Sequence, residues 1–357
     1  MLYRIQQLTD THSHLITNGF NMIAEKIIND NKRTDTGEII VTLFELCDLN
    51  CLFCSQDHNS VLGIDTIVEK FDQIKQVIDK LKTTKNKKSF SINIMGGEVF
   101  SDQLSDIVFE DYRTLIRLIQ NYSKESNIDI DIRFATNFVF DKKERVHKLV
   151  TDTGITLGTS YDPSGRFNKT TLVTFQDNVR EFTPYINGVN VIMTKPNMEC
   201  FVKDQVPFFD YLYEHFYVYF DHYTPERNMD FLLPKDVELR DFMKYMLDHW
   251  PNSFPFKNYP VKTKSNMTCM DTYTIMPDSN FGSCSILLKG VIPIKLIPSK
   301  AELEENWFDQ YDCLSCEHFS RCSMGCFLSN HIKNGRTQNE CWLKEVYNYV
   351  DSKGQQQ

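Results

Sequence analysis

The sequence contains no apolar run long enough to cross a bilayer, and residues 1–20 lack the charged-then-apolar order of a signal peptide. Positive charge is also scarce: 39 Lys and Arg stand against 48 Asp and Glu, for a formal net charge of −9 at pH 7. Binding to polyanions needs clustered Lys and Arg. The one basic stretch, residues 80–88, falls between a predicted helix and a predicted strand and is interpreted as a solvated loop. We therefore expect no membrane partner and no nucleic-acid partner.

Cysteine, by contrast, is abundant for a chain without a secretory signal, with 11 Cys in 357 residues. Such usage indicates a reducing compartment and metal ligation rather than disulfides, so a cytoplasmic location is expected. A hydrophobic fraction of 41% and a charged fraction of 24% are those of an ordinary globular protein. The length suffices for one large α/β domain with an appendage.

Apolar periodicity predicts strands that alternate with helices along most of the chain. Strand patterns cover 39–46, 90–94, 128–134, 155–160, 189–193 and 217–221, and helical spacing covers 64–81, 112–122, 142–150, 172–182 and 206–215. This alternation indicates parallel βαβ units, and six strands fit a partial, TIM-like (β/α)6 barrel of the α/β class, open on one side. Four regions are predicted: an N-terminal helical extension 1–36, the barrel 37–228, a bridging helix and linker 229–268, and a small cysteine-rich domain 269–357.

Three cysteines with the spacing Cys47-x3-Cys51-x2-Cys54 follow the first predicted strand. A loop at a strand end can fold three thiolates around one iron–sulfur cube, which leaves the fourth iron without a protein ligand. Such an open metal site can bind and activate a small molecule. A zinc knuckle, or three unrelated buried thiols, is the alternative interpretation.

The cysteine spacing, with the aromatic Phe53 before the last thiol, resembles the radical S-adenosylmethionine (SAM) superfamily. The resemblance implies that Cys47, Cys51 and Cys54 hold a [4Fe-4S] cluster whose free iron binds the amine and carboxylate of SAM. One electron from the reduced cluster would then cleave the sulfonium and release a 5′-deoxyadenosyl radical.

The resemblance extends to residues at the ends of later predicted strands, where barrel enzymes collect their active-site groups. It implies that Gly96, Gly97 and Glu98 bind the methionyl amine of SAM. It also implies further SAM contacts from Thr136, Asn137, Ser160, Asp162, Val191 and Ile192. A simple tight turn at the two glycines, and ordinary polar residues at strand ends, are the alternatives.

A second group of cysteines lies in the C-terminal region and resembles the SPASM extension of radical SAM enzymes. By this resemblance Cys313, Cys316, Cys322 and Cys341 would hold one auxiliary [4Fe-4S] cluster, and Cys269, Cys284 and Cys326 a second. The second set lacks a fourth thiol, so its fourth iron would be open, bound by a non-cysteine ligand, or bound by Cys200, the one cysteine left. Two zinc sites are the alternative.

The predicted reaction is hydrogen-atom abstraction, with a ribosomally made peptide as the substrate that is crosslinked, dehydrogenated or epimerised. A small molecule, such as an amino acid, sugar or cofactor precursor, is the alternative substrate. Formylglycine formation of the sulfatase-maturase kind is less favoured, because Ser285 stands where those enzymes have an aspartate base. A non-catalytic iron–sulfur or zinc protein is a further alternative.

The expected partners are a reductant such as flavodoxin or ferredoxin and, for a peptide substrate, a separate leader-binding protein. Few residues precede Cys47, which is why a built-in leader-binding domain is not expected. Three residues are candidates for catalysis: Cys200 as a hydrogen-atom donor, His222 for proton exchange and Tyr223 as a radical relay. Simple packing is the alternative for each of them.

Overall fold

The computed structural model describes residues 36–204, 206–223, 230–251, 272–282, 284, 288–289, 310–318, 322 and 341–354. The predicted helical extension in 1–35, together with Cys269 and Cys326, lies outside the described residues.

Six parallel strands form the main part of one sheet, and each pairs with its predecessor in the chain. They are β1 (Thr36–Thr42), β2 (Ser89–Met95), β3 (Asp129–Ala135), β4 (Thr156–Ser160), β5 (Ile186–Met193) and β6 (Tyr217–His222). Beyond β1 the sheet continues with β7 (Thr272–Ile275), which is parallel to β1, and β8 (Phe281–Gly282), which is antiparallel to β7. The sheet order is therefore β6-β5-β4-β3-β2-β1-β7-β8.

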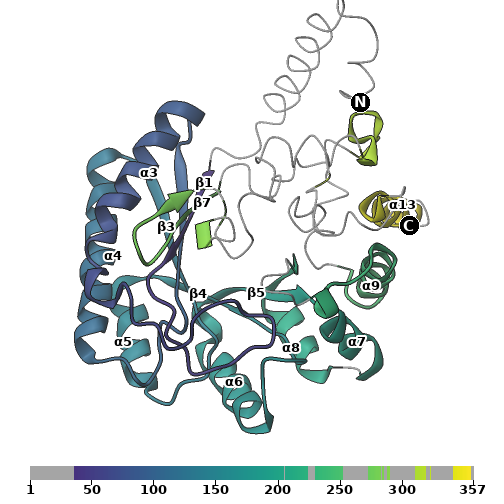
Figure 1. The fold of residues 1–357 in the computed structure, drawn as a ribbon, viewed down its shortest axis with the longest axis horizontal. Helices are drawn as coiled ribbons and strands as arrows, with labels where there is room; N and C mark the ends of the chain where they lie inside the picture. Colours follow the sequence, from purple (N-terminus) through teal and green to yellow (C-terminus); the bar gives the residue numbers. More distant parts are fainter. Residues whose placement is uncertain are drawn as a thin grey trace, which may run out of the picture.

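Helices follow the strands and cover the outer face of the sheet (Figure 1). They are α3 (Lys70–Lys85), α4 (Asp106–Ser126), α5 (Lys143–Thr153), α6 (Lys169–Phe182), α7 (Lys195–Asp204) and α8 (Pro207–His215). The predicted partial (β/α)6 barrel is confirmed. Two local predictions differ: the helix expected from residue 64 begins at Lys70, after the 3-10 turn Ile64–Thr66, and α7 was not predicted.

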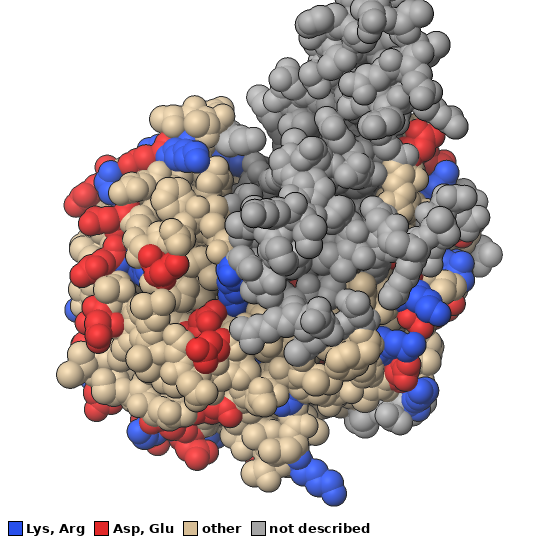
Figure 2. Space-filling view, in the orientation of Figure 1, with Lys and Arg blue, Asp and Glu red and all other residues tan. Residues whose placement is uncertain are grey.

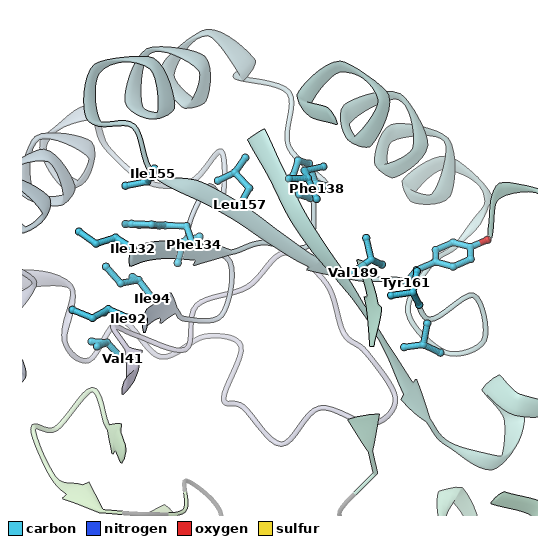
Figure 3. Packing of buried hydrophobic residues seen from close by; sticks show 14 of the residues in the cluster. Val41, Ile92, Ile94, Ile132, Phe134, Phe138, Ile155, Leu157, Tyr161 and Val189 are labelled. Atoms are coloured by element: carbon cyan, nitrogen blue, oxygen red, sulfur yellow. The ribbon is translucent and has the colours of Figure 1, made fainter. Parts of the chain in front are cut away.

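The hydrophobic core lies between the sheet and this helical layer (Figure 3). On β2 the side chains of Phe90, Ile92 and Ile94 are buried, while the intervening Ser91 and Asn93 are half-buried on the other face. Side chains of a strand alternate between the two faces of its sheet, so the strands send their apolar side chains toward the helices. The inner face of the curved sheet is left more polar.

The strand β7 belongs to the range 269–357 predicted as a separate cysteine-rich domain, yet it is hydrogen-bonded to β1.

A buried lysine, Lys70, donates hydrogen bonds to the turn that follows β7. Lys70 Nζ donates to the carbonyl oxygens of Met276 and Pro277 at 3.0 and 2.8 Å and to Ser279 Oγ at 3.0 Å. Burial lowers the pKa of Lys70. Ser279 itself has φ 70°, a left-handed conformation that non-glycine residues seldom adopt, so the ammonium stabilises a strained turn.

Replacing Lys70 by alanine should destabilise the fold by roughly 1–3 kcal/mol, because buried oxygen acceptors lose their donor. Lys75→Ala on the same helix is the matched control. The Lys75–Asp79 ion pair of 2.8 Å is exposed and screened by water, so its loss should cost clearly less than the loss of Lys70. Urea unfolding measures both values, and equal effects of the two substitutions would refute a special role for Lys70.

Two further helices, α9 (Asp236–His249) and α13 (Trp342–Gly354), lie side by side (Figure 1). The Tyr349 hydroxyl donates to Asp248 at 2.9 Å, and Trp342 and Tyr347 are buried in the same core cluster as the barrel strands. α9 matches the bridging helix predicted at 237–250. The described C-terminal segments are thus packed onto the barrel.

On the face seen in Figure 2, acidic side chains are spread over the barrel with basic side chains among them. None of the helices in the described ranges combines the length and apolar character needed to traverse a lipid bilayer.

Candidate functional site

The loop that carries the first three cysteines begins directly after β1. Its neck is closed by a hydrogen bond from the Cys47 amide to the His58 carbonyl at 3.0 Å, and its tip by one from the Cys54 amide to the Cys51 carbonyl at 3.0 Å. Cys51 is buried, and Cys47 and Cys54 are half-buried. The chain therefore presents the three thiols from one closed loop at the carboxyl end of the first strand.

The three thiols influence one another electrostatically. Burial raises the pKa of Cys47 to about 12, against the opposing effect of the Leu49 amide, which donates to Cys47 Sγ at 3.4 Å. Asn137 Nδ2 lies 3.8 Å from the same sulfur. Burial also raises the pKa of Cys51, and the Arg166 guanidinium lowers it.

This donor set suits thiolate ligation, since a cation that binds the sulfurs replaces their protons and the nearby N–H groups and guanidinium favour the charged form. Within the described ranges, no three Cys, His, Asp or Glu side chains are arranged to hold one metal ion. The residues of the loop fit a cluster held by thiolates, in which each cysteine binds a different iron.

The glycine pair at the end of β2 is required by a close approach of two backbone segments. A Cβ on Gly97 would stand 2.0 Å from the Leu46 carbonyl oxygen and 2.3 Å from that of Glu45. The Gly97 amide donates to the Phe44 carbonyl at 2.9 Å. The sequence predicted that these glycines let the backbone approach a ligand closely. In the structure, the group that approaches Gly97 closely is the backbone that leads into the cysteine loop. The glycines therefore lock the loop against β2.

Glu98 is fully buried and joins the ends of β2 and β3. Its carboxylate accepts from the Phe100 amide at 2.8 Å, the Thr136 hydroxyl at 2.7 Å and the Asn137 amide at 2.6 Å. Burial raises the pKa of Glu98 to about 7, although these hydrogen bonds oppose the shift. Glu98, Thr136 and Asn137, which one resemblance predicted at the ends of two strands, thus lie in direct contact.

The raised pKa of Glu98 predicts a pH-dependent stability. Because the folded state holds the proton more tightly than the unfolded chain, the contribution is full below about pH 4.5 and is lost as the pH rises through about 7. The difference between the Glu98 pKa of the unfolded chain and that of the folded protein corresponds to roughly 3 kcal/mol of folding free energy. Unfolding by urea at several pH values should show this decline in the wild type and a flatter profile in Glu98→Gln. Parallel profiles would contradict the assignment, whatever the mean offset between the two proteins.

Asp162, after β4, is a fully buried hub. It accepts from Arg166 Nη2 at 2.9 Å and Nε at 3.0 Å, from the Ile192 amide at 2.8 Å and from Asn197 Nδ2 at 3.2 Å. The Ser160 hydroxyl also donates to it. The structure therefore brings Ser160, Asp162 and the backbone of β5 together.

Arg166 is a site residue that the sequence did not reveal. Its guanidinium lies 5.3 Å from the Phe53 ring centroid, and its charge is felt at Cys51 and Cys54. The sequence signal was weak, a single arginine in a loop after a predicted strand. Held by Asp162 and Phe53, Arg166 supplies positive charge beside two thiols.

An apolar wall stands next to the cysteine loop. Tyr223, Leu232 and Leu233 form a buried cluster, and Phe53 and Ile192 pack against it. Val191, predicted as the companion of Ile192, lies in the core between sheet and helices instead. Neighbouring residues of a strand face opposite sides, so Ile192 alone can reach this wall.

The catalytic candidates occupy different surroundings. The centroids of the His222 and Trp342 rings lie 5.3 Å apart, and Trp342 is the residue that follows Cys341 in the chain. Tyr223 belongs to the apolar wall. Cys200 is on α7, and its electrostatic neighbour is Tyr161, whose pKa is raised mainly by burial. Tyr161 packs against aromatic rings of α6, α7 and α8, so Cys200 neighbours a ring of this aromatic layer.

Several of the C-terminal cysteines are also brought together. Cys313 and Cys316 are joined by a 3.1 Å backbone hydrogen bond, and the charge of Cys316 is felt at Cys341, whose pKa is raised chiefly by burial. Cys313 is buried in the core cluster, and Cys322 and Cys341 pack against it. Of the second predicted set, Cys284 alone is described, and it is half-buried.

The fold is shared with solved structures. The protein anSMEcpe with bound AdoMet superposes with a TM-score of 0.62 in a histidine-tagged form and 0.58 in its native form, at 13% and 14% identity. These alignments cover 89% and 88% of this chain and 97% of anSMEcpe in both cases. Streptococcus suis SuiB bound to S-adenosylmethionine aligns over 93% of this chain and 79% of its own at 16% identity, with a TM-score of 0.47.

No protein-family model and no curated protein matches the sequence. The resemblance to radical SAM enzymes seen in the motifs is thus matched by a resemblance in fold, to a protein that holds AdoMet.

Proposed function

We propose that the protein is a radical SAM enzyme that cleaves S-adenosylmethionine reductively to start hydrogen-atom abstraction. The observation that carries this proposal is the closed loop with three thiols at the end of β1, locked against Gly97 and flanked by Arg166. The fold shared with AdoMet-bound anSMEcpe supports it.

In this proposal Cys47, Cys51 and Cys54 hold a [4Fe-4S] cluster, which when bound supplies the electron for cleavage of the sulfonium. The chain's own side chains prepare the surroundings. The Arg166 guanidinium balances negative charge at the thiolates, and its pairing with Asp162 keeps it there. The wall that includes Phe53 and Ile192 excludes water from the adjoining space and offers an apolar face to the nucleoside.

Gly96, Glu98, Thr136, Asn137 and Ser160 are proposed to frame the SAM site. Glu98 fixes the ends of β2 and β3 relative to one another through its three hydrogen bonds. His222 and Tyr223 lie at the carboxyl end of β6, Tyr223 in the apolar wall and His222 beside Trp342, and both are proposed to contact the substrate.

We further propose two auxiliary [4Fe-4S] clusters, one on Cys313, Cys316, Cys322 and Cys341 and one on Cys269, Cys284 and Cys326. The grouping of Cys313, Cys316 and Cys341 supports the first set. The auxiliary domain is proposed to span 269–357, with the qualification that β7 and β8 belong to the barrel sheet.

The proposed substrate is a ribosomally made peptide, which is crosslinked, dehydrogenated or epimerised in the cytoplasm with flavodoxin or ferredoxin as reductant and a separate leader-binding protein. The C-terminal cysteine array favours this class, and a small molecule is the competing substrate. A short open reading frame that encodes a precursor beside the gene would favour the peptide.

The test is anaerobic reconstitution followed by reduction with dithionite in the presence of SAM. We expect release of 5′-deoxyadenosine and about 12 iron atoms per chain from three cubes. Bound zinc without iron, or a fully loaded protein that leaves SAM intact, would refute the proposed function.

A further inference from the structure

The segment around Cys284 is attached to the barrel at three points. β7 pairs with β1, the Lys70 ammonium holds the turn that follows, and Lys289 reaches the cysteine loop. The Leu288 amide donates to the Cys284 carbonyl at 3.1 Å, and Lys289 directly follows Leu288. A single short segment therefore carries both a candidate cluster ligand and a contact to the first cysteine site.

The Lys289 ammonium joins the two ends of the cysteine loop. It lies 2.9 Å from Glu45 Oε1 and donates to Ser55 Oγ at 3.3 Å. Glu45 precedes Cys47 by two residues, and Ser55 directly follows Cys54. The second oxygen of Glu45 accepts from the Asp57 amide at 3.0 Å, inside the same loop.

This ion pair is more enclosed than the Lys143–Glu181 pair on the outer helices of the barrel. The side chains of Lys289 and Glu45 are 15% and 18% exposed, whereas those of Lys143 and Glu181, at a similar distance of 2.8 Å, are 31% and 39% exposed. Enclosed pairs are screened less by water and salt, and removal of one partner leaves the other charge desolvated.

We propose that Lys289 is a positioning residue through which the Cys284 segment holds the neck of the cysteine loop closed. The two cysteine sites would then be coupled: a displacement of the Cys284 segment would loosen the loop that presents Cys47, Cys51 and Cys54. That this loop holds a cluster rests on the proposed function. The attachment of the loop to the Cys284 segment through Lys289 does not.

Hydrogen–deuterium exchange on the full-length protein before cluster loading tests the link. In Lys289→Met, amides within 45–58 should exchange about tenfold faster, because the neck opens more often. Lys143→Met removes the more exposed pair and should leave this loop unchanged, and Lys289→Arg should keep the slow exchange. Wild-type exchange in Lys289→Met would overturn the proposal, as would an equal acceleration in Lys143→Met.

A second readout separates this inference from the proposed function. In the reconstituted, reduced protein, electron paramagnetic resonance should detect SAM binding, with a weaker apparent affinity in Lys289→Met and a normal one in Lys289→Arg. A wild type whose spectrum ignores SAM would refute the proposed function and leave the exchange result intact. Normal SAM affinity with unchanged exchange in Lys289→Met would refute the positioning role alone.

Discussion

Replacing Cys47, Cys51 and Cys54 together by alanine is expected to abolish formation of 5′-deoxyadenosine, by more than ~1000-fold. The three thiols come from one loop. The cysteines that act electrostatically on Cys47 and Cys51 are members of the same trio, so the triple variant removes the whole ligand set. Iron should fall from about 12 to about 8 atoms per chain, because the auxiliary sites keep their own thiols. Iron analysis and chromatography of the nucleoside product measure both quantities.

Leu52→Ala is the matched control inside the same loop. Its side chain is 44% exposed, so iron content should stay near the wild-type value. Continued release of 5′-deoxyadenosine from the triple variant, or loss of all its iron, would contradict the assignment of these cysteines.

Replacing Asp162 by alanine is expected to destabilise the protein by roughly 3–5 kcal/mol. The Arg166 side chain, 12% exposed, would keep its charge without its carboxylate partner, and the Ile192 amide and Asn197 would lose an acceptor. SAM affinity should fall as well, since Arg166 and the backbone of β5 lose their common anchor. Urea unfolding and a binding titration of the reconstituted protein provide the two measurements.

Asp177→Ala offers the comparison for this effect. Arg180 and Asp177 form an exposed pair at 3.5 Å, and removal of the Asp177 carboxylate should cost less than about 0.5 kcal/mol, because the contacts of Arg180 with the Phe208 and Tyr211 rings stay in place. The double variant Asp162→Ala/Arg166→Met removes both charges and should recover part of the stability. A single Asp162→Ala variant within about 1 kcal/mol of the wild type would show that the hub is dispensable.

The barrel could be predicted from sequence because its strands alternate clearly. On β2 and β3 the buried residues Phe90, Ile92, Ile94, Ile132 and Phe134 follow the period of a strand with one face against helices. The pairing of β7 with β1 could not be predicted in this way. β7 is short, and its Thr272 meets Glu38 of β1 across 234 positions of the chain. No local pattern encodes such a distant pairing.

The helix α7 escaped prediction for a local reason. It follows β5 without a long linker and has ten residues, of which Pro196 and Asn197 do not favour a helix interior. Pro is tolerated in the first turn, where its missing N–H has no intrahelical partner. Cys200, which was expected after the fifth strand on the active face, lies on this helix.

The candidate site was predicted as a set of strand-end residues, and the structure adds their directions. Glu98, Thr136 and Asn137 were expected near one another because parallel strands end at one edge. That the Glu98 carboxylate faces the other two residues depends on side-chain packing. Arg166 was missed because its role comes from Asp162 and Phe53, which the fold brings together.

The central claim is that one iron of the first cluster has no protein ligand and accepts SAM. Electron–nuclear double resonance on the reduced, reconstituted protein with SAM labelled by ¹⁵N at its amino group tests it most directly. The account predicts a hyperfine coupling between the cluster and the labelled nitrogen, absent in the Cys47/Cys51/Cys54→Ala variant. A reduced first cluster that shows no coupling to the labelled nitrogen at saturating SAM would contradict it.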